Sequence, residues 1–546
     1  MRFQYILGLL FSLEAAALRF GNTPTYQVQK AAEERKAARS LVKRDDTDPE
    51  LLYPAYNLSV PTDFFHNETR YEPHTNDTFN LRYWFDASYY KPGGPVFVLL
   101  SGETDGTGRL TFLQKGIVHQ VIEATGGIGV ILEHRYYGTS FPVPNLSVEN
   151  LRFLSTEQAL ADVAYFAQHV SFEGIDEDLT APNTPWIAYG GSYAGAQAAF
   201  LRVVYPDVFW GTISSSGVTA AITDYWEYFE PIRQFAPPDG IAATQTYIDV
   251  IDSILLNNTD KTQQLKDAFG LGGITNDSDF ANVFTNGPYC WQSTNWDPDL
   301  NSPGCYYYFG NLSSTTVNYN WTEDKRETVQ DLLETAGYGN DSYAETVLLN
   351  AIGYFGETSV SAWNASGVSQ NDYFTLLNAS QWQDEEIDPA GGRSWNYQVC
   401  TEWGYFQTGN TPKDIKPIVS RTLTLEYTSF FCGAAYNLTL PDTDKVNKYG
   451  NFSIEYDRLA IVGGNADPWR PATPLADSAP KRPNTIEKPF WEIAHGVHHW
   501  EENGIFLNQT TPLLPPYPVI WAQQYIKNFV VEWLKEFDSK NDHYEL

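Results

Sequence analysis

Six short apolar runs constrain the fold more than any other feature of the sequence. They are rich in β-branched residues and end in glycine or in polar residues, as buried strands do. Helical patterns lie between them, and this alternation predicts right-handed crossovers and a mainly parallel sheet, so the fold class is α/β. The runs are GPVFVLLSGE (94–103), GGIGVILEHRYYG (126–138), PWIAYGG (185–191), GTISSSG (211–217), RLAIVGG (458–464) and FWEIAHG (490–496).

Two segments predict helices between and after these strands. STEQALADVAYFAQHV (155–170) opens with Ser155 as a helix cap, followed by Glu and Gln in the first turn. VIWAQQYIKNFVVEWLKEF (519–537) carries an aromatic residue at every fourth position, which predicts an amphipathic helix.

The alternation of strand and helix breaks between Ile222 and Tyr436. This interval is rich in turn residues, contains all four cysteines and lies between two predicted strands. We interpret it as a mainly helical cap inserted into the α/β core; the alternative is a poorly patterned section of one domain. The predicted organisation is a signal peptide (1–17), a pro-segment (18–44), the first segment of the α/β-hydrolase core (45–221), the cap (222–436) and the second segment of the core (437–546).

The first residues have the pattern of a secretory signal. Arg2 supplies a positive charge, residues 5–13 an apolar stretch and residues 15–17 small side chains. The basic segment that follows ends in Lys43 and Arg44, and we interpret it as a removable pro-segment; the alternative is an exposed charged helix with an incidental Lys–Arg pair. No later run is apolar enough to span a membrane.

The four cysteines predict two disulfides, because an exported chain meets an oxidising compartment. Three pairings exist, and Cys290–Cys305 with Cys400–Cys432 is favoured because it closes the shorter loops. No C-x-x-C pair suggests a metal site, and the sequence predicts neither a metal nor a cofactor.

Glycosylation acceptors of the N-x-S/T type are dense along the chain, which favours a secreted glycoprotein or one delivered to a vacuole or lysosome. The formal net charge of −32 argues against nucleic-acid binding, since no basic face neutralises phosphates. The same charge is compatible with activity at acid pH, where protonation of carboxylates reduces the repulsion between them. The sequence leaves open whether the chain forms a homodimer. The acceptors are Asn57, Asn67, Asn76, Asn145, Asn257, Asn276, Asn311, Asn320, Asn340, Asn364, Asn378, Asn437, Asn451 and Asn508.

Ser192 is the candidate nucleophile. It lies in WIAYGGSYAGAQAAF (186–200), where a strand-like run, two glycines and a helix with small residues follow in the order of a nucleophile elbow. The template is G-x-S-x-G, but Ala194 replaces the second glycine, which arrives one position late at Gly195. The alternative is an ordinary turn serine.

A serine needs a base and an orienting acid, which follow it in the order acid, then histidine, in chains with this elbow. Asp467 follows the 458–464 strand, and His495, His498 and His499 follow the 490–496 strand. Each has a plainer interpretation: Asp467 with Pro468 as a turn, or any one histidine as a hydrogen-bonded core residue. A metal site does not fit, because Glu492, His495 and His498 do not form H-E-x-x-H.

With these residues placed, the chain resembles the secreted or lysosomal serine peptidases of the prolyl carboxypeptidase group, which includes dipeptidyl peptidases and fungal acid prolyl endopeptidases. The resemblance covers nearly all of the chain after the predicted pro-segment. Its blocks are EHRYYGTS (133–140), LSTEQALAD (154–162), GGSYAG (190–195), CTEWGYFQT (400–408), GGNADPW (463–469) and GVHHW (496–500).

The resemblance implies an α/β-hydrolase core with a helical cap and cleavage after proline. It assigns Ser192 as nucleophile, Asp467 as orienting acid and His498 as base, with His499 as second candidate. Members of the group often carry an arginine shortly after the histidine pair; here the stretch reads WEENG (500–504), so tuning of the base by arginine is not expected.

Further residues are expected around the nucleophile. The oxyanion hole should combine the backbone N–H of Tyr193 with one from the loop after the 94–103 strand, at Gly102 or Glu103. Glu103 is equally interpreted as a substrate-facing carboxylate or as a plain loop residue. Glu402 and Trp403, in the cap block, are candidates for bordering the substrate pocket, although core packing is the better interpretation for an arbitrary aromatic.

The sequence therefore predicts a secreted serine peptidase that acts on peptide or protein substrates through an acyl-enzyme, with serine carboxypeptidase activity at Pro-X bonds favoured. An acid prolyl endopeptidase and a dipeptidyl or tripeptidyl peptidase are the alternatives within the group. A carboxylesterase or lipase would use the same triad. A non-catalytic protein on this fold would normally lack a triad member, and none is missing.

Overall fold

A computed structural model describes residues 48–257, 260–301 and 303–542. The predicted signal peptide and pro-segment (1–44) lie outside these described residues.

The core is one eight-stranded sheet with the order β1-β2-β4-β3-β5-β6-β9-β10. From β4 to β10 every neighbouring pair is parallel, while β1 and β2 run antiparallel at one edge. All six strands predicted from the sequence are present. The strands are β1 (Tyr56–Pro61), β2 (Thr78–Asp86), β3 (Val96–Leu100), β4 (Ile128–Leu132), β5 (Trp186–Gly191), β6 (Gly211–Ser215), β9 (Leu459–Gly464) and β10 (Phe490–Ile493).

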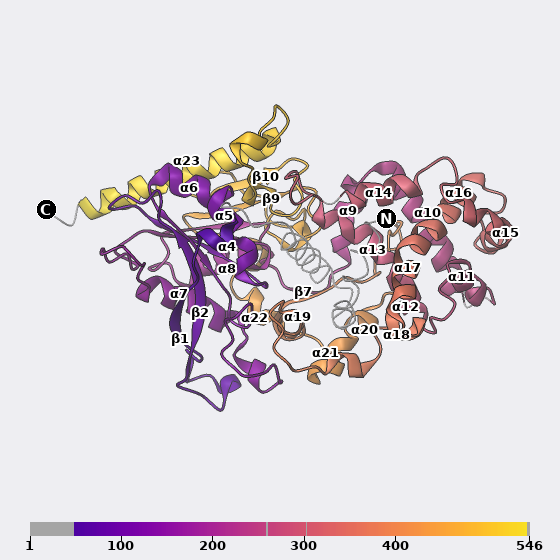
Figure 1. The fold of residues 1–546 in the computed structure, drawn as a ribbon, viewed down its shortest axis with the longest axis horizontal. Coiled ribbons are helices and arrows are strands. Elements are labelled where there is room, and N and C mark those ends of the chain that lie inside the picture. Colours follow the sequence, from indigo (N-terminus) through magenta and orange to yellow (C-terminus); the bar gives the residue numbers. More distant parts are fainter. Residues whose placement is uncertain (1–47, 258–259, 302, 543–546) are drawn as a thin grey trace.

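The two faces of this sheet are covered by different helices (Figure 1). Alternate side chains of β3 enter different cores: Phe97 packs with α6 and α23, and Val98 with α7 and α8. The predicted cap of α7 is confirmed, because Ser155 accepts a hydrogen bond from the Gln158 N–H. The helices around the sheet are α4 (Pro49–Leu52), α5 (Thr111–Gln114), α6 (Ile117–Thr125), α7 (Thr156–His169), α8 (Tyr193–Val204), α22 (Asp444–Asn447) and α23 (Tyr517–Asp542).

The chain between β6 and β9 is mainly helical, and helices α9 to α18 gather beside the sheet in Figure 1. Two short strands, β7 (Ile222–Asp224) and β8 (Gly404–Phe406), pair in parallel in this region. Its helices are α9 (Phe229–Phe235), α10 (Pro238–Leu255), α11 (Thr262–Ala268), α12 (Asp277–Asn282), α13 (Asn286–Tyr289), α14 (Gly304–Leu312), α15 (Arg326–Thr335), α16 (Ser342–Phe355), α17 (Ser361–Ser366), α18 (Gln370–Phe374), α19 (Gly392–Gln398), α20 (Leu425–Thr428) and α21 (Phe430–Tyr436). The domain boundaries stay a prediction.

Both predicted disulfides are formed, Cys290–Cys305 and Cys400–Cys432. Each joins segments of the inserted region, while the sheet relies on its apolar cores. The strand order, the crossovers and the insertion after β6 make this an α/β-hydrolase fold with a mainly helical insertion.

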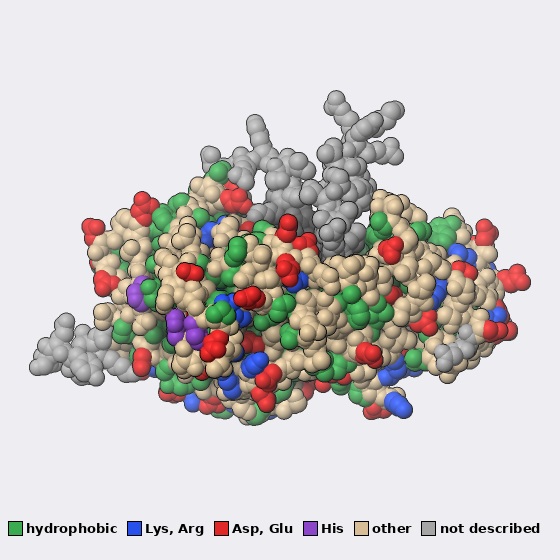
Figure 2. Space-filling view, turned by 90° about the horizontal axis from the view of Figure 1, so that it is seen from below, with side chains coloured by type: hydrophobic (Ala, Val, Ile, Leu, Met, Phe, Trp, Pro, Cys, Tyr) green, Lys and Arg blue, Asp and Glu red, His purple; other side chains and the backbone are tan. Residues whose placement is uncertain are grey.

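Figure 2 shows acidic side chains scattered over one face of the molecule, as the excess of acidic residues in the sequence predicts. The whole sequence has 67 Asp and Glu against 35 Lys and Arg. Among the described residues no helix has the length and apolar character needed to cross a membrane. None of the predicted glycosylation asparagines is buried.

Candidate active site

Ser192 occupies the sharp turn between β5 and α8. Its backbone has φ 61° and ψ −124°, a conformation that residues with a side chain rarely adopt. Such a residue costs about 1–3 kcal/mol and persists only where its surroundings enforce it. The strain supports a functional nucleophile elbow over an ordinary turn.

The glycines around Ser192 explain the departure from the elbow template. A Cβ at Gly190 would lie 2.0 Å from the Ala194 carbonyl oxygen, and one at Gly195 would lie 2.7 Å from the Ser215 carbonyl oxygen. Both positions therefore require glycine. The methyl group of Ala194 faces Gly102, where even an added Cβ would lie 3.4 Å away, an ordinary van der Waals contact, so alanine fits at this position. The late glycine allows α8 to pack against β6.

Asp467 and His498 form a buried pair after β9 and β10. His498 Nδ1 lies 3.0 Å from Oδ1 and 2.9 Å from Oδ2 of Asp467, and Asp467 also accepts a hydrogen bond from the Trp469 N–H. Burial alone would raise the pKa of Asp467, but the charge and hydrogen bond of His498 outweigh it and lower that pKa. The acid therefore stays ionised and holds the imidazole.

The structure separates the three candidate histidines. His495 is exposed, and its backbone N–H binds the Asn465 side chain. His499 has its Nδ1 2.7 Å from Glu502, and its ring centre lies 4.5 Å from that of His498. Only His498, of these three, is held by Asp467.

One pocket brings Ser192 and His498 together, with a cavity volume of about 160 Å³. It lies where the carboxyl ends of the parallel strands meet, the usual place for a ligand in such sheets. Its remaining lining residues are Glu103, Thr104, Gly108, Arg109, Tyr193, Val218, Gln292, Trp395, Tyr405, Trp469 and His499.

The pocket is lined by aromatic residues in one part and by charged residues in another. Trp395, Tyr405 and Trp469 supply aromatic surface, partly from the inserted region. Glu103 and Arg109, from the segment after β3, supply charged groups together with His499. No sequence pattern assigned a role to Arg109 or to the aromatic residues. Tyr405 and Trp469 lie inside the blocks that carry the family resemblance, whereas nothing in the pattern around Arg109 distinguishes it.

Three carboxyls lie on or near the charged side of the pocket: the half-buried Glu103 lines it, and the buried Glu501 and Glu502 lie close to His499. Burial raises the pKa of Glu103, and the charges of Arg109 and His499 only partly oppose it. Burial also acts on Glu502, but the charge and hydrogen bond of His499 and the charge of Arg109 outweigh it, so the pKa of Glu502 is lowered. Burial raises the pKa of Glu501. At acid pH this side of the pocket therefore carries less negative charge than its composition suggests.

The predicted oxyanion-hole segments are close to the nucleophile. Tyr193 begins α8, and both Tyr193 and Glu103 line the pocket beside Ser192. Gly102, with φ 70°, lies against Ala194. The roles of these backbone N–H groups stay a prediction.

The structure corrects the prediction that Glu402 and Trp403 border the pocket. Glu402 is buried and accepts hydrogen bonds from the backbone and hydroxyl of Thr156 at the start of α7. Trp403 is fully buried, with its ring 5.0 Å from that of Tyr193. Both lie behind the pocket lining and join the inserted region to the core.

Comparison with known proteins agrees with this geometry. The family model described as "Serine carboxypeptidase S28" matches residues 69–293 and 308–481. A protein of Arthroderma benhamiae named "Probable extracellular serine carboxypeptidase" is 46% identical, covering 96% of this chain and 74% of its own. The human "Thymus-specific serine protease" is 26% identical, covering 72% and 73% of the two chains.

Among solved structures, a proline iminopeptidase of Mycobacterium smegmatis aligns over 88% of this chain and 99% of its own, with 12% identity and a TM-score of 0.35. The family assignment rests on the sequence matches, which include every block around Ser192 and Asp467. The chain belongs to the serine carboxypeptidase S28 family.

Proposed function

We propose that this protein is a secreted serine carboxypeptidase that cleaves Pro-X bonds through an acyl-enzyme. The observation that carries the proposal is that Ser192 and the Asp467-bound His498 line one pocket. Family membership supports a serine peptidase over an esterase or lipase built on the same fold.

The chemistry follows from the hydrogen bonds of His498. Because Nδ1 donates to the ionised Asp467, Nε2 is left as the basic nitrogen of the neutral ring. Nε2 takes the proton of Ser192 as the hydroxyl attacks the peptide carbonyl, and then protonates the leaving amine. Water hydrolyses the ester by the same route in reverse order.

Arg109 supports a carboxypeptidase over an endopeptidase. Its Nε donates to the Ser101 carbonyl oxygen at 3.3 Å, and within the described chain its charge acts on the nearby carboxyls of Glu103 and Glu502 without a close ion pair. A guanidinium with available N–H groups fits a carboxylate by paired hydrogen bonds. In this pocket it would bind the free carboxylate of a substrate cut one residue from its end.

The aromatic surface supports a preference for proline. Trp395, Tyr405 and Trp469 supply aromatic ring surface to the pocket that contains Ser192. The rigid apolar pyrrolidine ring buries well against such surfaces, with little conformational entropy to lose. The residue before the scissile bond would occupy this side of the pocket.

Secretion is supported by two observations. The relative from Arthroderma benhamiae is named as extracellular, and no N-x-S/T asparagine in the described chain is buried. Two disulfides agree with an oxidising compartment.

The test is digestion of an N-terminally blocked peptide with proline in the second-last position, with products identified by mass spectrometry. We expect loss of the last residue only, no turnover with Ser192→Ala, and full turnover with Ser88→Ala, an exposed serine. Internal cuts would indicate an endopeptidase. Release of amino-terminal di- or tripeptides from an unblocked peptide would indicate a dipeptidyl or tripeptidyl peptidase. Hydrolysis of p-nitrophenyl esters without any peptide cleavage would indicate an esterase.

A further inference from the structure

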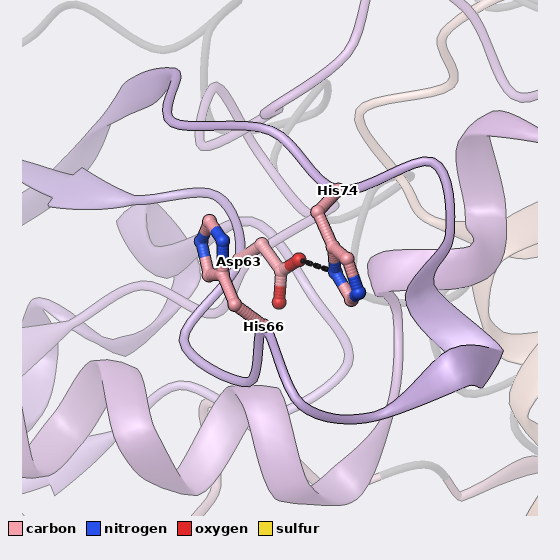
Figure 3. A group of neighbouring side chains, drawn as sticks. All are labelled: Asp63, His66 and His74. Atoms are coloured by element: carbon pink, nitrogen blue, oxygen red, sulfur yellow. Dashed lines mark hydrogen bonds and ion pairs between the residues drawn. The ribbon is translucent and has the colours of Figure 1, made fainter.

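A second group of reactive side chains lies away from the catalytic pocket, in the connection between β1 and β2. Asp63, His66 and His74 come together there, and Figure 3 shows the carboxylate flanked by the two imidazole rings. None of the three lines the catalytic pocket. Asp63 is buried, His74 is partly exposed and His66 is exposed.

The three side chains offer ligand atoms close together. One carboxylate oxygen and one ring nitrogen from each histidine lie within 4.8 Å of one another. His74 Nδ1 is 2.8 Å from Oδ2 of Asp63, and the rings of His66 and His74 stack with centres 5.3 Å apart. The chain segments before and after the short helix η2 (Thr69–Tyr71) therefore bring these three side chains together.

Hydrogen bonds hold the carboxylate of Asp63 in place through both oxygens, and the partner of Oδ2 is His74, itself a candidate ligand. Its Oδ1 accepts from the Phe65 N–H at 2.9 Å and from Gln158 Nε2, on α7, at 2.8 Å. Oδ2 faces His74. This is the arrangement that orients a metal-binding carboxylate, with its second oxygen bound by outer hydrogen-bond donors.

A buried carboxylate that faces two imidazole rings supplies the kind of donor set that a divalent cation binds.

We propose that Asp63, His66 and His74 bind one divalent transition-metal ion of the zinc class. Two imidazole nitrogens and one carboxylate oxygen suit Zn²⁺, whereas Ca²⁺ and Mg²⁺ prefer sites made of oxygen alone. Bonds of about 2.0–2.2 Å require the ligand atoms to draw closer than they now lie. Rotation of the exposed His66 ring supplies this movement without disturbing the core, and water completes the coordination.

The ion would close the η2 loop. His66 and His74 lie on either side of η2, whose Arg70 forms ion pairs with Glu157 on α7 and with Glu402 in the inserted region. Fixing the base of this loop limits its movement, so the ion stabilises the folded protein that binds it. The site has no contact with the catalytic residues, and peptidase activity should not require it.

The test uses full-length protein stripped of metal with a chelator and titrated with Zn²⁺ at pH 7 by calorimetry, with Co²⁺ absorption as a second readout. We expect one equivalent to bind and the melting temperature to rise. Loss of a residue that only hydrogen-bonds to a metal ligand typically weakens metal binding roughly 10–100-fold. His66→Ala removes a ligand itself and should weaken Zn²⁺ binding by at least that much. His169→Ala, at another exposed histidine, should bind as the unmodified protein does, and all three proteins should cleave peptide equally after metal removal.

Asp63→Asn serves as a second variant, because it keeps the shape of the side chain while removing the charge. Equal Zn²⁺ affinity in the unmodified protein, His66→Ala and Asp63→Asn would overturn the proposal, as would binding of Ca²⁺ in preference to Zn²⁺. Binding should also weaken below pH 6 as protons compete for the imidazoles, and an unchanged affinity at pH 4.5 would likewise contradict it.

Discussion

His498 Nδ1 is shared between both oxygens of Asp467, at 2.9 and 3.0 Å, so the acid fixes both the tautomer and the orientation of the ring. Asp467→Asn keeps the size of the side chain but can present an N–H where Nδ1 needs an acceptor. The ring would then expose Nε2–H to Ser192, and that nitrogen could no longer act as a base. We expect kcat to fall about 10³–10⁴-fold with an unchanged melting temperature. A loss smaller than tenfold on a Pro-X peptide would contradict the assigned role.

The elbow makes opposite predictions for two adjacent positions. Gly195→Ala places a methyl group 2.7 Å from the Ser215 carbonyl oxygen and 2.8 Å from the Gly217 Cα, both backbone atoms that cannot turn aside. We expect a loss of about 1–3 kcal/mol in the free energy of unfolding, together with reduced kcat. Ala194→Gly restores the common motif and removes only a methyl group facing Gly102.

The matched measurement is urea unfolding and peptide turnover for both variants. Ala194→Gly should keep most of its activity and cost about 1 kcal/mol or less, the usual effect of glycine in a helix. If Gly195→Ala were as stable and active as the unmodified protein, the packing explanation for the late glycine would be wrong.

Five of the six predicted strands, all except the edge strand β10, are buried on both faces. Each therefore forms a continuous apolar run ending in glycine or polar residues, which is why the sequence predicts it. Strands β1 and β2 were not predicted, and the reason is physical. Their burial alternates along the strand, as in YNLSVP (56–61), because only one face is covered. In isolation such short alternating segments resemble loops rich in polar residues.

The proximity of Ser192, Asp467 and His498 could be predicted because each follows a strand, and parallel strands bring their carboxyl ends together; their catalytic roles stay a prediction. Arg109 could not, since one arginine in a glycine-rich loop has no periodicity. Glu402 was placed wrongly because sequence cannot distinguish a carboxylate that faces substrate from one that binds a helix N-terminus. The Asp63, His66 and His74 group has a D-x-x-H spacing, but His74 joins it only through the folding of the η2 loop.

Arg109 predicts a difference between two substrates. Arg109→Gln removes the cation that we expect to bind the terminal carboxylate, so KM for a free-acid peptide should rise about tenfold or more, the usual size of a charge-assisted contact. The same peptide with a carboxy-terminal amide should be cleaved equally slowly by both proteins. If the unmodified enzyme cleaves acid and amide equally well, Arg109 does not select the carboxylate, and serine peptidase activity still stands.

Glu103 predicts the alkaline limit of activity. Its raised pKa favours the neutral carboxyl in acid, and above that pKa a carboxylate in the same pocket as Ser192 would disfavour the oxyanion that develops there. Activity should therefore fall as the pH rises through the raised pKa. Glu103→Gln stays neutral, and its profile of kcat/KM should extend further toward alkaline pH than that of the unmodified protein. An unchanged alkaline limb would show that another group sets it.

Glu501 predicts how stability depends on pH. The side chain is fully buried next to Glu502, and burial, with the added charge of Glu502, raises the pKa of Glu501 against the effects of Ser215 and His499. A carboxyl whose pKa is higher folded than unfolded binds more protons in the folded state, so its contribution is present in acid and is lost as the pH rises from about 4.3 through the folded pKa.

Glu501→Gln cannot ionise, so its free energy of unfolding should fall less between pH 4.5 and pH 7 than that of the unmodified protein. Urea unfolding at several pH values measures this difference. Glu334→Gln, at an exposed glutamate on α15, controls for the change in net charge and should follow the unmodified protein. Equal pH dependence in both variants would mean that Glu501 does not ionise across this range, and the acid stability would then come from the general repulsion of a chain with a net charge of −32.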